Sequence, residues 1–197
     1  MSARPWIAFD TETTGLPPRK TPNADNWAEW DKCRLVQLAW EIRGVSGGAT
    51  PEPIRKCYII LPDCFTIPAE VVRIHGIDTE RARAEGRPLA QILAEFADDI
   101  TQYDVKTVAA HNMSFDDGVI LAELYRADLK SILGLWTGLD KKCTMLMGAR
   151  LRSGGKWPKL HVLYEQLCGP LPADTRLHNA DIDTKLCADI YEKMIAD

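Results

Sequence analysis

Trp6-Ile7-Ala8-Phe9-Asp10-Thr11-Glu12-Thr13 places two carboxylates at the end of an apolar run. The run from Trp6 to Phe9 is typical of a buried β-strand. Residues two apart in a strand point to the same face, so Asp10 and Glu12 point together if the strand continues to Thr13. An ionised carboxylate in an apolar setting is costly unless it is paired or binds a cation. We therefore predict a polar site at the end of this strand.

Two further aspartates fall on the apolar stripes of predicted helices. On a helix over 115–126, Asp116 lies one turn before Val119 and Ile120; on a helix over 180–195, Asp183 precedes Leu186 by three residues. Each aspartate alone could be a capping or salt-bridging acid, because both lie near helix starts. Four inward-facing acids together indicate bound Mg²⁺ or Mn²⁺, since these hard cations take oxygen ligands.

The remaining periodicity predicts an α/β fold in which helices cover a sheet. Strands are expected over 35–42, 54–61 and 105–110, and further helices over 68–76, 89–100 and 160–167, with a turn-rich connector over 44–53. Residues 17–32 contain three prolines and two tryptophans without a clear period. We interpret them as a long loop, and predict a mobile flap beside the site; a packed surface excursion is the alternative.

The composition is that of one soluble domain over residues 1–197, with 46% hydrophobic and 26% charged residues. No apolar run approaches the ~20 residues of a bilayer crossing, and the first residues lack the pattern of a secretory signal. We expect a cytoplasmic protein with no membrane contact. The net charge of −4 argues against a protein that coats nucleic acid electrostatically, although bound cations would reverse the local charge that a phosphate meets.

Three short motifs resemble those of the DnaQ-like, or DEDDh, exonucleases of the RNase H-like superfamily. The segment from Phe9 to Leu16 resembles their first motif, the segment from His111 to Asp116 their second, and the segment from His178 to Asp183 their third. The resemblance spans Ile7 to Tyr191, nearly the whole chain. Residues 17–32 make a longer connection than compact members have, which leaves the substrate preference open.

This resemblance implies an RNase H-like fold with a central five-stranded mixed sheet flanked by helices, in one exonuclease domain. It implies a 3′–5′ exonuclease that releases nucleoside 5′-monophosphates from a DNA or RNA 3′ end, in proofreading or repair. Two Mg²⁺ or Mn²⁺ ions would be held by Asp10, Glu12, Asp116 and Asp183, and His178 would deprotonate the attacking water. Substrate contacts carry over to Thr13, Leu16, Asn112 and Phe115, with core packing as the alternative for Leu16 and Phe115. A polymerase or a second copy of the chain would be a further partner.

Two other readings compete with an active exonuclease. The first is a catalytically inactive exonuclease-like module that binds nucleic acid or a polymerase, although such a module has no chemical need for all four acids and the histidine. The second is a zinc hydrolase, which is disfavoured because the site offers one histidine and no sulfur ligand; the six cysteines form no CxxC pair and are expected to be free thiols. A basic group around Trp157 could cradle a phosphate backbone and stack a base, or form a solvated face: Lys141, Lys142, Arg150, Arg152, Lys156 and Lys159.

Overall fold

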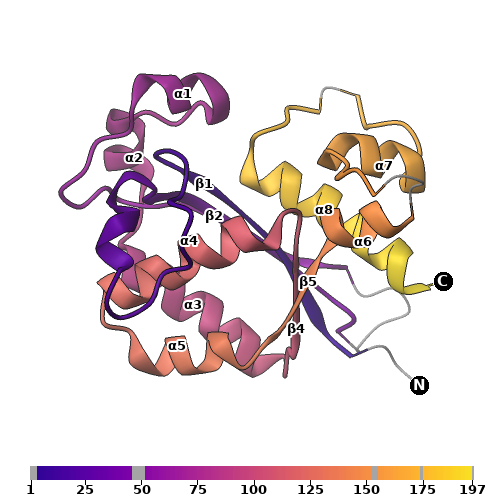
Figure 1. The fold of residues 1–197 in the computed structure, drawn as a ribbon, viewed down its shortest axis with the longest axis horizontal. Helices are drawn as coiled ribbons and strands as arrows, with labels where there is room; N and C mark the ends of the chain where they lie inside the picture. The colour runs from indigo at the N-terminus through magenta and orange to yellow at the C-terminus, as the bar shows by residue number, and fades with distance from the viewer. Residues whose placement is uncertain (1–3, 46–51, 152–154, 174, 197) are drawn as a thin grey trace.

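A five-stranded mixed sheet forms the centre of the computed structural model, which describes residues 4–45, 52–151, 155–173 and 175–196 (Figure 1). The order β3-β2-β1-β4-β5 places β1 in the middle, antiparallel to β2 and parallel to β4. The expected mixed sheet is therefore confirmed. The strands are β1 (Trp6–Thr13), β2 (Leu35–Arg43), β3 (Ile54–Ile59), β4 (Thr107–Ala110) and β5 (Asp140–Cys143).

Helices cover both faces of the sheet (Figure 1). One face packs on α3 (Leu89–Gln102), α4 (Met113–Arg126) and α5 (Lys130–Thr137). The other packs on α8 (Ala180–Ala196), which α6 (Thr144–Arg150) and α7 (Leu160–Cys168) support. In the sequence, α1 (Ala69–His75) and α2 (Thr79–Glu85) lie between β3 and α3. Within the described residues, no helix combines the length and apolar character that a membrane crossing requires.

The alternation of β1 explains how the sheet presents its carboxylates. Ile7 and Phe9 belong to the core shared with α3, α4 and α5, whereas Trp6 and Ala8 pack against α8. Asp10 is two residues beyond Ala8, so it continues the face that α8 covers. The face of β1 that α8 covers thus changes from apolar to polar where the strand reaches the N-terminal end of α8.

Residues 15–33 form an excursion between β1 and β2. Two hydrogen bonds between Thr14 and Arg34 close its base, here called the closed neck. The Thr14 N–H donates to Arg34 O at 2.9 Å, and the Arg34 N–H donates to Thr14 Oγ1 at 2.9 Å. The excursion ends in a 3-10 helix, η1 (Trp27–Lys32). Trp30 is only 3% exposed, and its ring lies so close to Gly118 of α4 that a Cβ there would be 2.2 Å from it. The flap expectation therefore does not hold for η1, which is anchored in the core through Trp30.

We predict that Trp30→Ala destabilises the protein by about 3–5 kcal/mol, because it empties a ring-sized space beside the backbone of α4. At this chain length, such a loss lowers the melting temperature by roughly 6–20 °C. Trp27→Ala is the matched control, since Trp27 is only partly buried and its ring faces the Arg126 guanidinium. Urea unfolding of both variants measures the difference. A loss at Trp30 no larger than that at Trp27 would contradict the core assignment.

Sequence periodicity missed several elements. β5 contains Asp140, Lys141 and Lys142, which leaves no apolar run to recognise, and as an edge strand it pairs only with β4. The five-strand expectation came from the family resemblance. The sequence analysis also did not predict the short helices α2, α5 and α6, because seven or eight residues make only about two helical turns, too few to show a clear period. Most of the turn-rich connector over 44–53, and Arg152 of the basic group, lie outside the described residues. All six cysteines are free thiols, as expected.

Candidate active site

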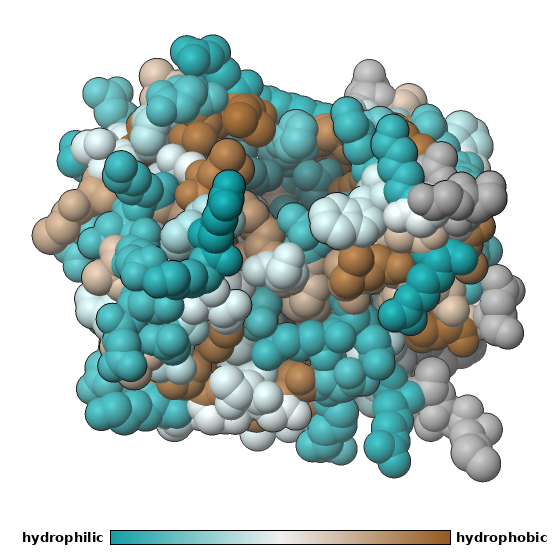
Figure 2. Space-filling model, viewed as in Figure 1, coloured by the Kyte–Doolittle hydropathy of each residue, from teal (hydrophilic) through white to brown (hydrophobic). Residues whose placement is uncertain are grey.

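A cavity of about 810 Å³ opens beside the end of β1. Figure 2 shows the molecule hollowed between α1 and the side formed by α6 and α7, with a hydrophilic floor. The structure gathers at this one cavity every residue that the sequence assigned to the site: Asp10, Glu12, Thr13, Leu16, Asn112, Phe115, Asp116, His178 and Asp183.

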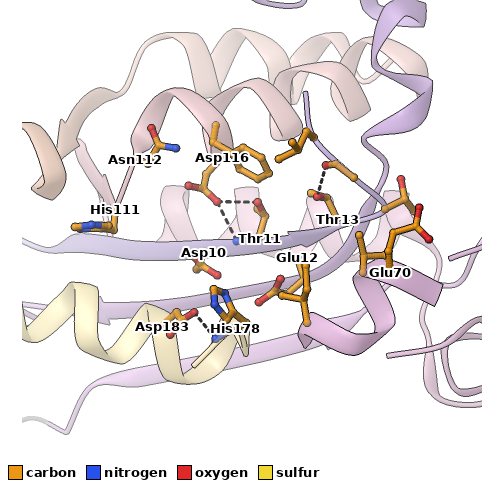
Figure 3. Close-up of a pocket in the computed structure, with 16 residues that line it drawn as sticks. Asp10, Thr11, Glu12, Thr13, Glu70, His111, Asn112, Asp116, His178 and Asp183 are labelled. Atoms are coloured by element: carbon orange, nitrogen blue, oxygen red, sulfur yellow. Dashed lines mark hydrogen bonds between the residues drawn. The ribbon is translucent and has the colours of Figure 1, made fainter. Parts of the chain in front are cut away.

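Asp10, Glu12 and Asp183 form a close group of carboxylates. One oxygen from each lies within 4.8 Å of the others, and Figure 3 shows β1 and α8 presenting them toward one another. Two hydrogen bonds hold the start of α8 on β2. The Ala180 N–H donates to Gln37 Oε1 at 3.2 Å, and Thr184 Oγ1 donates to Ala39 O at 3.3 Å. The position of Asp183 over β1 is thus fixed by bonds to the neighbouring strand.

Asp116 reaches the same cavity from the opposite face of the sheet. Pairing of β1 with β4 ends at Ala8 and Ala109, so β1 continues beyond its parallel neighbour. On this extension, Thr11 donates to Asp116 Oδ1 from both its N–H, at 3.1 Å, and its Oγ1, at 2.7 Å (Figure 3). Asp116 is therefore oriented by the strand that carries Asp10 and Glu12.

Burial raises the pKa of all four carboxyl groups, and repulsion from the neighbouring acids raises those of Asp10 and Glu12 further. Burial raises the pKa of Asp10 well above its usual value, and the charges of Asp116, Asp183 and Glu12 raise it further. Burial, then Asp183 and Asp116, raise the pKa of Glu12 to about 8. Burial raises the pKa of Asp116 to about 7 against the opposing bonds from Thr11, and that of Asp183 to about 6 against the bond from the His178 N–H. Without a cation, these acids disfavour one another's ionised forms.

One buried oxygen indicates what would relieve this repulsion. Among the described residues, Asp183 Oδ1 is a buried oxygen without a hydrogen-bond partner, although Oδ2 of the same carboxylate accepts the His178 N–H at 3.0 Å. Buried acceptors are rarely left unsatisfied. Oδ1 belongs to a group of three converging carboxylates, which is an oxygen-only donor set suited to Mg²⁺ or Mn²⁺. The residues present therefore fit a divalent cation.

His178 stands at the mouth of the cavity, immediately before α8. Its backbone is left-handed, with φ 60°, and its N–H bond to Asp183 fixes the loop at the carboxylate group. The imidazole is exposed and projects into the cavity near Glu12 (Figure 3). A tyrosine could position the attacking water in place of a histidine, and Tyr191 is the tyrosine of α8. It packs instead edge-on against Trp6, with ring centroids 4.8 Å apart. Of these two residues, His178 is the one that lines the cavity.

These motifs, in this geometry, correspond to a family model described as exonuclease, RNase T, which matches residues 7–191. The chain belongs to this exonuclease family. The resemblance to the DnaQ-like exonucleases is confirmed, and the chain is by family a nuclease of the hydrolase class.

Relatives of the exonuclease include the DNA polymerase III subunits epsilon of Rickettsia conorii and Rickettsia felis. Each is 29% identical, over 99% and 98% of this chain and 75% of the relative. The solved structure of E. coli exonuclease I with a dT13 oligonucleotide is similar over 98% of this chain, with 21% identity and a TM-score of 0.68; apo exonuclease I gives 20% and 0.67. The fold is therefore RNase H-like. The chain spans only 41% and 42% of those exonuclease I chains.

The residues predicted to contact substrate differ in their burial and in the local interactions that hold them in place. Leu16 is 84% exposed at the cavity, which excludes core packing, whereas Phe115 is partly buried and packs against the main core while lining the cavity. Thr13 is buried and its Oγ1 donates to Gly15 O at 2.8 Å, which shapes the turn before Leu16. Asn112 has a left-handed backbone, φ 74°, between β4 and α4. Their contacts with substrate remain predictions.

Sequence reasoning assigned no role to one wall of the cavity. Glu70, Val71 and Ile74 of α1 line it, and Ile74 is 50% exposed. Their one-turn spacing puts them on one helix face, but two apolar residues in a seven-residue helix do not distinguish a substrate wall from core packing. His111, quoted only as part of a motif, also lines the cavity.

We expect the metal-free exonuclease to lose stability as pH rises from about 4 to about 8. Unfolded carboxyl groups titrate near 4, whereas those of Asp183, Asp116 and Glu12 titrate at about 6, 7 and 8 in the fold. The folded state then binds more protons than the unfolded state, so the free energy of unfolding falls with rising pH. Thermal melts with EDTA across this range measure the loss. Mg²⁺ should reduce it, and Glu12→Gln should flatten the metal-free curve; a metal-free melting temperature that rises through the window would contradict the expectation.

Proposed function

We propose that this protein is a 3′–5′ exonuclease that hydrolyses the last phosphodiester bond of a DNA 3′ end and releases a nucleoside 5′-monophosphate. The observation that carries the proposal is the group formed by Asp10, Glu12 and Asp183, in which one oxygen of each carboxylate lies within 4.8 Å of the others and Oδ1 of Asp183 is buried without a hydrogen-bond partner. Family membership supplies the reaction class. The subunits epsilon among the relatives favour DNA as the substrate and a polymerase as a partner.

Asp10, Glu12, Asp116 and Asp183 would hold two Mg²⁺ or Mn²⁺ ions. Bound there, the cations would neutralise the charge of the phosphate, stabilise the charge that develops during its displacement and acidify water. Asp116 would take part through the oxygen that Thr11 does not occupy, because Oδ1 already accepts two hydrogen bonds. Leu16 and Ile74 would bracket the terminal base with exposed aliphatic carbon, and Phe115 would form the floor beneath it.

His178 would take the proton from the attacking water. A water O–P bond forms and the P–O3′ bond breaks, so the departing nucleotide carries the phosphate. The 3′ oxygen of the shortened strand takes a proton from solvent water and becomes a hydroxyl. The imidazole suits this role because it is exposed at the cavity mouth while its loop is fixed by the N–H bond to Asp183.

Digestion of 5′-labelled oligonucleotides tests the proposal. Matched DNA and RNA, single- and double-stranded, are incubated with Mg²⁺, Mn²⁺, Zn²⁺ or EDTA. The expected result is a ladder that shortens from the 3′ end with release of mononucleotides, with Mg²⁺ or Mn²⁺ and not with EDTA. Internal cuts or release from the 5′ end would overturn the proposal. Binding without cleavage under every condition would favour the inactive module instead.

A further inference from the structure

A second hollow, of about 490 Å³, adjoins the carboxylate group on the side away from α1. It shares Asp10, His111, His178 and Asp183 with the main cavity and continues to Trp157 and His161. The carboxylates thus lie between two spaces. A strand whose last phosphodiester sits over them needs room on both sides, one for the departing nucleotide and one for the nucleotide that precedes it.

Trp157 is the largest exposed apolar side chain in the described part of the chain, with 65% of its surface accessible. It lines the second hollow, together with Lys159. Lys159 is exposed and has no ion-pair partner among the described residues, whereas Lys141 and Lys142 of the basic group face Asp117 and Asp140. An aromatic ring beside an unpaired cation is the combination with which proteins bind single-stranded nucleic acid.

A partly buried pair of hydrogen bonds made by His111, here called the latch, holds the backbone next to Trp157 at this hollow. Pro158 is buried, and its carbonyl oxygen lies 3.1 Å from Nε2 of His111, while Nδ1 lies 2.9 Å from Thr144 Oγ1. A carbonyl only accepts, so Nε2 carries the proton and Nδ1 accepts from the threonine. His111 directly follows β4, so this latch ties the backbone next to Trp157 to the sheet that carries the site. The indole is therefore exposed but held by a fixed backbone.

We propose that Trp157 stacks on the base of the penultimate nucleotide, so that the enzyme acts on 3′ ends with at least two unpaired nucleotides. The inference rests on the proposed function, which places the departing nucleotide in the main cavity. A base within a duplex has both faces covered by its neighbours, so its face reaches an indole only when the strand is single and splayed. Every base has such a face, so the contact selects unpaired ends without selecting sequence.

Kinetics of Trp157→Ala and Trp157→Phe on two substrates test this inference. On single-stranded oligo(dT), Trp157→Ala should raise KM about tenfold, which corresponds to about 1.4 kcal/mol, and Trp157→Phe should restore most of the loss. On the 4-nitrophenyl ester of thymidine 5′-monophosphate, which has no penultimate base, both variants should match the wild type. Duplexes with 3′ overhangs of increasing length should be cut by the wild type only once two nucleotides are unpaired. An equal loss on both substrates, an unchanged KM on oligo(dT) or efficient cutting of blunt duplexes would overturn the inference.

A binding experiment separates this inference from the proposed function. Oligo(dT) with Ca²⁺ in place of Mg²⁺ should quench tryptophan fluorescence, and the quench should disappear in Trp157→Phe. Trp27→Phe is the matched control, because Trp27 lies on η1 against Arg126 and should leave the quench intact. If the wild type cuts neither substrate, the proposed function fails, and the quench alone then decides the stacking. A quench that persists in Trp157→Phe would overturn it.

Discussion

Asp10→Asn should lower kcat about 10³-fold or more while leaving the metal-free protein at least as stable as the wild type near pH 8. The loss follows if Asp10 is a cation ligand as proposed, since cation stabilisation of a phosphoryl transition state is worth several kcal/mol and each 1.4 kcal/mol is about tenfold in rate. The retained or increased stability follows from removing a charge that burial and three neighbouring acids disfavour. Single-turnover cleavage of a labelled oligonucleotide and thermal melts with EDTA measure the two effects.

Asp117→Asn is the matched control for this variant. Asp117 neighbours Asp116 in sequence, but its Oδ1 faces Lys141 Nζ at 3.2 Å and accepts from Trp136 Nε1 at 2.8 Å, away from the cavity. Its replacement should weaken the fold slightly and spare the rate. If Asp10→Asn instead unfolds the metal-free protein while the wild type gains nothing from Mg²⁺, then Asp10 is a structural acid and the cation site is wrong.

His178→Asn should lower kcat by about 10²- to 10⁴-fold, the range for a positioned general base. Asparagine tolerates the left-handed backbone at this position, and the N–H bond to Asp183 does not depend on the side chain, so the loop should keep its shape. Calorimetric titration with Mn²⁺ should therefore give the wild-type affinity. In His178→Gly, which is also compatible with φ 60°, added imidazole should restore part of the rate.

The control for the base is Tyr191→Phe, which removes the hydroxyl of the alternative residue and should leave the rate unchanged, because Tyr191 packs on Trp6. A near-normal rate for His178→Asn at neutral pH and saturating Mg²⁺ would remove His178 from the mechanism. A large loss of Mn²⁺ binding would make it a ligand instead.

The pairing of Asp10 with Glu12 was accessible from sequence because strand alternation is a local rule, and β1 obeys it as far as Glu12, where its register with β2 shifts. Asp183 was accessible for a similar reason, since its helical stripe runs through Leu186 and Cys187. The hydrogen bonds from Thr11 that orient Asp116 could not be predicted from sequence. They join residues 105 positions apart, at the point where β1 extends beyond its pairing with β4. Such a contact depends on strand lengths and sheet order, which no single stretch of sequence encodes.

The walls of the site were harder to predict than its floor. Trp30 and Trp157 are both tryptophans in stretches of sequence without an apolar period, yet one is buried against Gly118 and the other is exposed at a hollow. Composition treats them alike, because burial in a loop follows from what lies opposite and not from a periodic pattern. Trp30 required a glycine on a distant helix, and Trp157 required the His111 bond to Pro158.

The closed neck at Thr14 and Arg34 separates the backbone of the site into two segments that can change independently of each other. Asp10, Glu12 and Thr13 precede the neck on the central strand, while Leu16 lies within the excursion that the neck closes. Lengthening a closed loop adds little entropy cost, about 0.6 kcal/mol for each doubling of its length. The stretch between Leu16 and η1 can therefore be lengthened or exchanged without moving the strand that carries the carboxylates. Substrate choice can diversify in this protein while its chemistry is conserved.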